Sequence, residues 1–106
     1  MNESELDFDP DELAMLRQLF RAEAQDALDE VTRRVLAAGT SKPSNDALTE
    51  MMRVTHTLKG AAGTVGLGEM VELSHRLEGA LAAFRGDRAP WTTTTADQLV
   101  EIADRL

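Results

Sequence analysis

The chain has 106 residues, of which 42% are hydrophobic and 28% charged, and its 19 acidic and 11 basic side chains give a formal net charge of −8. A chain this short folds as one small domain with little room for a deep catalytic cleft. The negative charge repels phosphate backbones and anionic lipid headgroups, which argues against nucleic acid and bare membrane surfaces as partners. The absence of cysteine excludes disulfides and thiol chemistry and fits a cytoplasmic setting, and no apolar run approaches the ~18 residues of a membrane span.

The first predicted helix follows an acidic lead-in, residues 1–9. Asp9 is placed to cap the helix, with Pro10 at its first position and Glu12 completing a capping box. Apolar residues then recur every three or four positions until Gly39, which predicts a helix from residue 10 to about 37. The stripe comprises Leu13, Leu16, Phe20, Ala24, Ala27, Val31 and Val35.

The next two predicted helices are separated by Gly66-Leu67-Gly68. The second begins at a cap on Ser44 or Asn45, after a loop that contains Pro43, and the third ends at Gly86. The second helix places on one face Ala47, Met51, Val54, Leu58, Ala62 and Val65. The third has an apolar stripe of Met70, Leu73, Leu77, Leu81 and Phe84.

A connector from residue 87 to 94 contains Trp91, which we expect to fold back on the core. Thr95 and Gln98 form a second capping box, opening a fourth helix whose predicted inward residues are Leu99, Ile102, Ala103 and Leu106. Helices with short connections and no strand signal predict an all-α, antiparallel four-helix bundle. The helical pattern still runs at residue 106, so we expect the chain to be a fragment of a longer protein.

His56 lies on the side of the second helix opposite the apolar stripe. Gly60 and Gly63 share that face, although each glycine costs up to ~1 kcal/mol relative to alanine inside a helix. Bare backbone beside an exposed histidine allows another protein to approach closely. The pattern therefore predicts a histidine presented to a partner.

Further polar residues accompany His56. Lys59, three residues on, would offset the charge of a phosphoryl group on the imidazole, although spacing alone favours a solvated surface lysine. Lys59 and Arg53 together predict a locally basic site around His56. On the third helix, His75 and Glu78 flank the apolar stripe, and an antiparallel pairing about residues 66–68 would bring Glu78 level with His56. Glu78 either orients the imidazole or pairs with a neighbouring arginine.

Two other kinds of protein fit parts of the pattern. Glu72 and His75 have the E-x-x-H spacing of di-iron bundles, but those sites need a second such pair, and Arg53 stands at the corresponding place before His56. A non-catalytic helical interaction module needs none of the polar residues, and it leaves the helix glycines and the His75/Glu78 pair unexplained.

The string from His56 to Gly66, HTLKGAAGTVG, resembles the H-x-x-K-G phosphorylation motif of histidine phosphotransfer (HPt) domains. It is most similar to the P1 domain of CheA chemotaxis kinases, and the likeness covers most of residues 10–106. The resemblance implies that His56 is phosphorylated, that Lys59 balances charge, that Gly60 allows close approach, and that His75 and Glu78 hydrogen-bond with the acceptor. P1 domains often have a longer fourth helix and a fifth, so we expect a C-terminal helix to be missing.

The resemblance also implies partners. A CheA-type kinase domain would use ATP and Mg²⁺ to phosphorylate His56, and a CheY-like response regulator would take the phosphoryl onto an aspartate. The chain has no phosphate-binding loop and no acidic metal cluster, so we expect no metal or cofactor of its own. An HPt module of a hybrid relay outside chemotaxis is the alternative. The expected docking face comprises, around His56, Thr49, Met52, Arg53, Gly60, Gly63 and Leu67.

Overall fold

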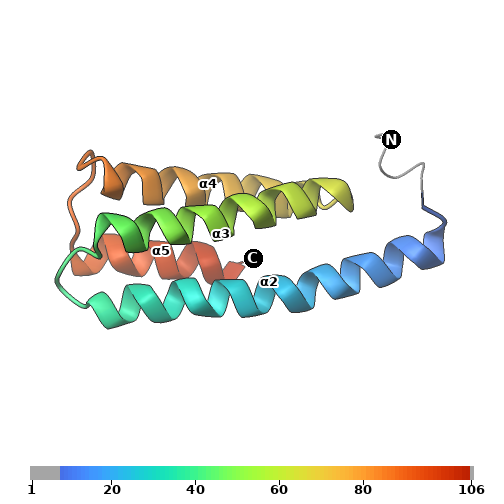
Figure 1. Ribbon diagram of the computed structural model, residues 1–106, viewed down its shortest axis with the longest axis horizontal. Helices are drawn as coiled ribbons and strands as arrows, with labels where there is room; N and C mark the ends of the chain where they lie inside the picture. Colours follow the sequence, from blue (N-terminus) through green and yellow to red (C-terminus); the bar gives the residue numbers. More distant parts are fainter. Residues whose placement is uncertain (1–7, 106) are drawn as a thin grey trace.

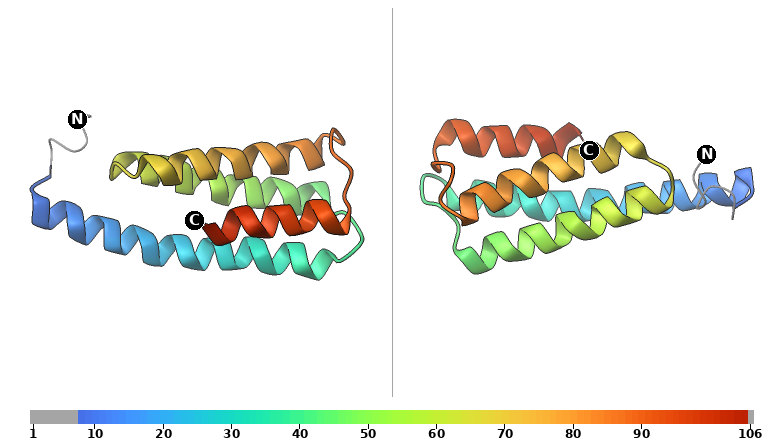
Figure 2. Two further views of the ribbon diagram at one scale, coloured as in Figure 1. Left: turned by 180° about the vertical axis from the view of Figure 1, so that it is seen from behind. Right: turned by 90° about the horizontal axis from the view of Figure 1, so that it is seen from above.

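Four α-helices run antiparallel to their chain neighbours in a computed structural model that describes residues 8–105, apart from the side chain of Ala103. They are α2 (Pro10–Ala38), α3 (Asn45–Thr64), α4 (Gly68–Arg85) and α5 (Thr93–Arg105). Each helix packs against the next along the chain, and α5 closes the ring against α2 (Figures 1 and 2). The predicted all-α four-helix bundle is confirmed. Residues 1–7 of the lead-in lie outside the described part.

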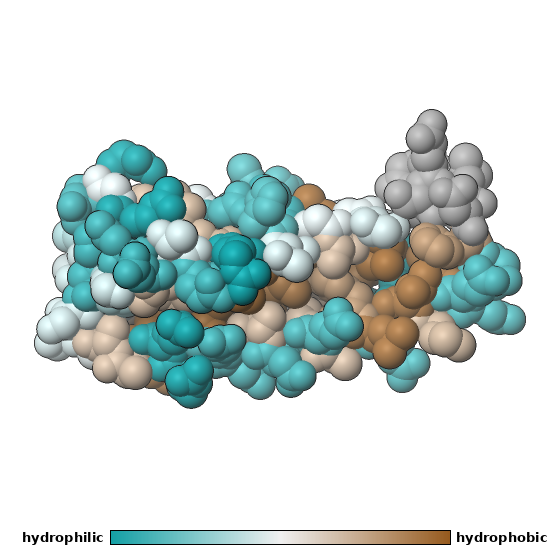
Figure 3. All heavy atoms as spheres, in the orientation of Figure 1, coloured by the Kyte–Doolittle hydropathy of each residue, from teal (hydrophilic) through white to brown (hydrophobic). Residues whose placement is uncertain are grey.

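Helix α2 extends beyond the rest of the bundle. Its cap is as predicted, because the Glu12 N–H donates to Asp9 Oδ1 at 2.8 Å, and the helix ends at Gly39 with a φ of +59°. Its 29 residues span roughly 44 Å, whereas the 13 residues of α5 span roughly 20 Å. The N-terminal end of α2 reaches past the α3–α4 turn, and apolar surface gathers in this region (Figures 1 and 3). Met15 and Leu19 are 63% and 56% exposed.

The buried face of α3 is wider than the predicted stripe. Leu48 and Thr55 are fully buried, while Ala47 and Val54 are half-buried. The reason is that α3 packs against both α2 and α4, so residues on two flanks of the helix enter the core. Thr55 can be buried because its Oγ1 donates to the Met51 carbonyl at 2.8 Å. In α2 the same effect buries Leu28 more deeply than the predicted Ala27.

A tight turn at residues 65–67 joins α3 to α4. The Leu67 N–H donates to the Ala62 carbonyl at 2.9 Å, and the Gly66 N–H donates to the Gly63 carbonyl at 3.2 Å. These two bonds form a Schellman motif, which requires a left-handed residue, and Gly66 supplies it with a φ of +73°. The turn fixes how far each residue of α3 and α4 lies from the point where the chain reverses.

Helix α5 begins earlier than predicted. Thr92 and Thr95 cap each other: the Thr95 N–H donates to Thr92 Oγ1 at 3.1 Å, and the Thr92 N–H donates to Thr95 Oγ1 at 2.8 Å. The helix is therefore capped by Thr92, three residues before the predicted cap at Thr95. Thr95 instead occupies the fourth position of the capping box, the role predicted for Gln98. Trp91 does fold back, meeting Phe84 edge to face with ring centroids 4.9 Å apart. Of the predicted inward residues, Leu99 is buried and Ile102 is half-buried, while the side chains of Ala103 and Leu106 lie outside the described part.

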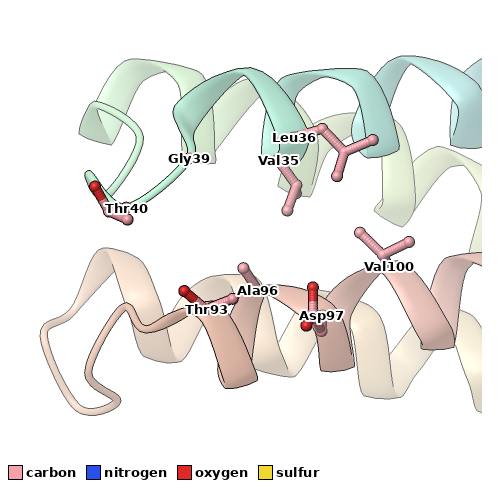
Figure 4. Close-up of a pocket in the computed structure, with 8 residues that line it drawn as sticks. All are labelled: Val35, Leu36, Gly39, Thr40, Thr93, Ala96, Asp97 and Val100. Carbon is pink, nitrogen blue, oxygen red and sulfur yellow. The ribbon is translucent and has the colours of Figure 1, made fainter.

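A pocket of about 280 Å³ lies between the end of α2 and the start of α5 (Figure 4). Its lining is mainly apolar and includes Val35, Leu36, Ala96 and Val100. None of the residues expected to form the functional site lines it. No helix in the described part of the chain is both long and apolar enough to cross a membrane.

Alanine at Gly66 should destabilise the domain by about 1–2 kcal/mol, because an L-residue resists the left-handed conformation. Alanine at Gly79 is the matched control. A Cβ there would have no atom within 4 Å, so G79A should instead stabilise the exposed helix by about 0.5–1 kcal/mol. Urea unfolding followed by circular dichroism measures both changes. If G66A were as stable as the parent protein, the turn would not need the positive φ.

Candidate functional site

His56 stands on the middle of α3 with its side chain 72% exposed. The opposite face of the same helix is held in the core by Met51, Thr55, Leu58 and Ala62, all buried. Because α3 is anchored along that face, the histidine is held at a fixed place on the surface. It is presented to solvent, as the sequence pattern predicts.

A single carboxylate on α4 connects His56 with Lys59. Nδ1 of His56 lies 2.8 Å from Oε2 of Glu78, and the Lys59 ammonium donates to Oε1 of the same carboxylate at 2.8 Å. Each oxygen of Glu78 thus has its own partner on α3. The contact spans 22 residues of sequence, and it forms because the Gly66 turn brings the middle of α4 level with the middle of α3.

The charges of the triad formed by His56, Lys59 and Glu78 favour one tautomer of the imidazole. The hydrogen bond from Lys59 is the main cause that holds the pKa of Glu78 below its ordinary value, and the hydrogen bond from His56 lowers it further. Glu78 is therefore an ionised acceptor near neutral pH, so Nδ1 of His56 carries the proton and donates it. The neutral ring then has its lone pair on Nε2, on the edge away from Glu78. An exposed imidazole with a free Nε2 is a nucleophile.

The sequence left open whether Glu78 orients the imidazole or pairs with an arginine. The geometry favours the first, since Glu78 faces His56 and Lys59 and not an arginine. Lys59 is not a freely solvated lysine, because its side chain is only 24% exposed. His75 lies one turn before Glu78 with an exposed side chain, and within the described residues no hydrogen bond joins it to another group. The structure thus brings Glu78 and Lys59 to His56, whereas the hydrogen bond between His75 and the acceptor that the resemblance implies is not present among the described residues.

The prediction of a locally basic site is wrong. Arg53 donates to both carboxylate oxygens of Glu50, at 3.1 and 2.5 Å, and Lys59 is paired with Glu78. The hydrogen bond from Arg53 also lowers the pKa of Glu50, so this carboxylate stays charged. Both bases on which the prediction rested therefore have their own acid, so neither is an unopposed positive charge beside His56. The spacing of Glu50 three residues before Arg53 was the available signal for this pair.

The expected docking face is partly open. Gly60 is exposed, and a Cβ added there would have no atom within 4 Å. Gly63 is half-buried beside α4, where an added Cβ would lie 3.9 Å from Val71 Cγ2. Thr49 accepts a hydrogen bond from Arg85 at 3.3 Å. The two apolar members of the face, Met52 and Leu67, are half-buried and pack against the core.

No group of three or more His, Asp or Glu side chains in the described part of the chain is arranged to hold a metal ion. The E-x-x-H pair of Glu72 and His75 lacks the second pair of ligands that a di-iron centre requires. Both side chains are exposed, whereas the ligands of such centres project into the interior of the bundle. The di-iron interpretation therefore gains no support from the structure.

A four-helix bundle that presents an exposed histidine, hydrogen-bonded through Nδ1 to the neighbouring helix, is the architecture that the phosphotransfer motif implied. Residues 15–106 match the sequence profile described as Hpt domain, so the chain belongs to the Hpt domain family.

Curated relatives of the chain carry the name chemotaxis protein CheA. That of Treponema pallidum is 29% identical over 85 residues, covering 80% of this chain and 10% of the relative. That of Bacillus subtilis is 28% identical, with 83% and 13% covered, and that of Klebsiella aerogenes is 26% identical, with 88% and 14% covered. The chain thus spans about a tenth of the length of these relatives. No solved structure matches it significantly. The predicted similarity to CheA phosphotransfer domains is confirmed.

Glu78→Gln should lower the free energy of unfolding by about 1 kcal/mol at pH 7, because glutamine cannot pair with the Lys59 ammonium as a carboxylate does. The pKa of Glu78 is lower in the folded than in the unfolded chain, so its stabilising effect is complete above the ordinary carboxyl range. That effect is lost as the pH falls through the lowered folded pKa. Urea unfolding at several pH values from 7 to 3 should show the parent and E78Q converging at the acid end.

Glu72→Gln is the control, since Glu72 is an exposed carboxylate of the same helix and has no hydrogen-bond partner within the described residues. Its unfolding curve should stay close to that of the parent throughout the range. A difference between E78Q and the parent that stays constant with pH would show that the ionised carboxylate does not stabilise the fold.

Proposed function

We propose that this domain is the phosphohistidine carrier of a chemotaxis two-component relay and that His56 is the phosphorylated residue. The observation that carries the proposal is the hydrogen bond between Nδ1 of His56 and Glu78, which leaves Nε2 unprotonated on an exposed imidazole. Membership of the Hpt domain family supports the same assignment.

In the first step, the lone pair of Nε2 forms a P–N bond with the γ-phosphorus of ATP while the bond from that phosphorus to the β-phosphate oxygen breaks. ADP leaves, and the ring holds a positive charge with its proton still on Nδ1. The Glu78 carboxylate faces that proton at 2.8 Å, so it stabilises the charge as it develops. Glu78 acts through the ring as a positioning residue.

In the second step, an aspartate oxygen of a CheY-like response regulator attacks the phosphorus in line, and the P–N bond breaks. Its electron pair returns to Nε2, which restores the neutral imidazole with the proton on Nδ1. Because His56 lies on an anchored helix face, the regulator can bring its acidic site to the phosphoryl with little rearrangement of this domain. Transient interfaces of this kind are small.

The catalytic machinery for both steps belongs to the partners in this proposal. ATP and Mg²⁺ are used by a CheA-type kinase domain, which positions the γ-phosphoryl and neutralises its charge. The Hpt domain family is one of phosphotransfer carriers, and this chain supplies an oriented nucleophile. The relatives named chemotaxis protein CheA favour chemotaxis over a hybrid relay of another pathway, and they are much longer than this domain.

Incubation with an active CheA-type kinase core and labelled ATP tests the proposal. The domain should acquire a label that is labile in acid and stable in alkali, as expected of a phosphorus–nitrogen bond, and His56→Gln should abolish it. A label that persists in the variant, or that never forms on the parent protein, would contradict the assignment. Circular dichroism of the variant confirms that its helices are intact.

Alanine at Gly60 should separate function from stability. The added Cβ meets nothing within the domain, so G60A should be as stable as the parent or about 0.5–1 kcal/mol more stable. It should nevertheless slow phosphotransfer to a CheY-like regulator about tenfold, since overpacking a close contact costs on the order of 1–2 kcal/mol. G79A, the same change at an open position of α4, is the control. Equal transfer rates for G60A and G79A would remove Gly60 from the contact.

A further inference from the structure

We propose that Arg53, and not Lys59, is the side chain that ion-pairs with the phosphoryl group once it is bound to Nε2 of His56. The inference rests on the function proposed above and adds to it a residue that holds and neutralises the transferred group. Arg53 is thereby a phosphate-binding residue of the phosphorylated state, and its pairing with Glu50 belongs to the resting state.

Lys59 already has a counterion. Its ammonium lies 2.8 Å from Oε1 of Glu78, and the two side chains are only 24% and 20% exposed. The positive charge of Lys59 is therefore balanced before any phosphoryl arrives. A phosphoryl group brings a charge of about −1.5 to −2 at neutral pH, which exceeds the single positive charge of the phosphorylated ring. Because Lys59 and Glu78 neutralise each other, the net negative charge that remains on phosphorylated His56 has no partner within this triad.

Arg53 lies one turn before His56 on the exposed side of α3. It lies three residues before His56 as Lys59 lies three after, so the two bases are displaced by 60° in opposite directions around the helix. Glu78 occupies the Nδ1 edge of the ring, beside Lys59, which leaves Nε2 on the edge away from it. Side chains of a helix lean toward its N-terminus, so the imidazole leans over the turn that carries Arg53. Arg53 itself leans toward Glu50, so it meets the phosphoryl group by changing rotamer. The Arg53 side chain is 67% exposed and therefore free to change rotamer.

The resting partner of Arg53 can release it at little cost. Glu50 is also influenced by Arg34 of α2, whose charge adds to the lowering of the Glu50 pKa that the Arg53 hydrogen bond mainly causes. Glu30 of α2, which pairs with Arg34 at 3.1 Å, contributes weakly to raising the pKa of Arg53, which the hydrogen bond to Glu50 mainly causes. When Arg53 turns away, Arg34 remains near Glu50. Exposed ion pairs contribute little to stability, whereas a guanidinium binds the oxygens of a phosphoryl group in a bidentate manner.

The test uses phosphoramidate as a chemical donor, so that no kinase or regulator is present. Nε2 forms its bond to phosphorus while the P–N bond of phosphoramidate breaks and ammonia leaves. The ³¹P resonance of phosphorylated His56 is identified by its absence from His56→Gln. Titration of that resonance with pH then gives the pKa of the phosphoryl group, which a nearby guanidinium lowers because it favours the dianion.

Arg53→Gln should raise the pKa of the phosphoryl group by about half a unit, the size expected of one exposed ion pair. Glu50→Gln, which removes the resting partner and frees the guanidinium, should shift it in the opposite direction. Arg33→Gln is the matched control: it removes the same charge from an exposed arginine that also pairs with a glutamate, Glu30 at 3.8 Å, but on α2. It should leave the pKa unchanged within about 0.1 unit.

Equal shifts in R53Q and R33Q would overturn the proposal, because they would reflect net charge and not a local contact. No shift in R53Q would overturn it too. The outcome is independent of the relay itself. A failure of the kinase to label His56 would contradict the proposed function and leave this titration meaningful. Normal labelling together with an unchanged phosphoryl pKa in R53Q would contradict only the role of Arg53.

Discussion

The carboxylate of Glu78 is the group on which the geometry of the candidate site depends. It touches α3 twice, at His56 and at Lys59, and in doing so it sets the tautomer of the histidine and engages the lysine. The remainder of the fold serves to hold this one side chain opposite its partners. The Gly66 turn sets the register of α3 and α4, and the buried faces of both helices keep them from rotating.

Much of the architecture could be predicted from the sequence because helix periodicity and caps are local signals. The Asp9 cap, the stop at Gly39 and the return of Trp91 to the core needed nothing beyond neighbouring residues. The burial of Leu48 and Thr55 was missed, since it depends on which helices lie on each flank of α3. The start of α5 was misplaced because a run of threonines offers several equivalent caps, and hydrogen bonds among them select one.

The site shows the same division between local and tertiary information. Spacing along the chain was enough to single out His56 and to bring Glu78 level with it, but it could not decide between an imidazole and an arginine as the partner of Glu78. It also misjudged the charge. Arg53 and Lys59 look like two unopposed bases in sequence, whereas in the structure each faces a carboxylate. Neither base is therefore an unopposed charge beside His56, and the acidic excess of the chain lies in residues 1–30.

The register between His56 and Glu78 also limits how the length of the chain can change. One residue inserted into α4 between the turn and Glu78 would swing that side chain by about 100° and carry it off the face of α3. Seven residues, close to two full turns, would restore the direction but shift Glu78 by roughly 10 Å along the axis. The 22 residues from His56 to Glu78 are thus constrained in number by the contact between the two side chains, whereas the far ends of both helices can lengthen or shorten without disturbing it.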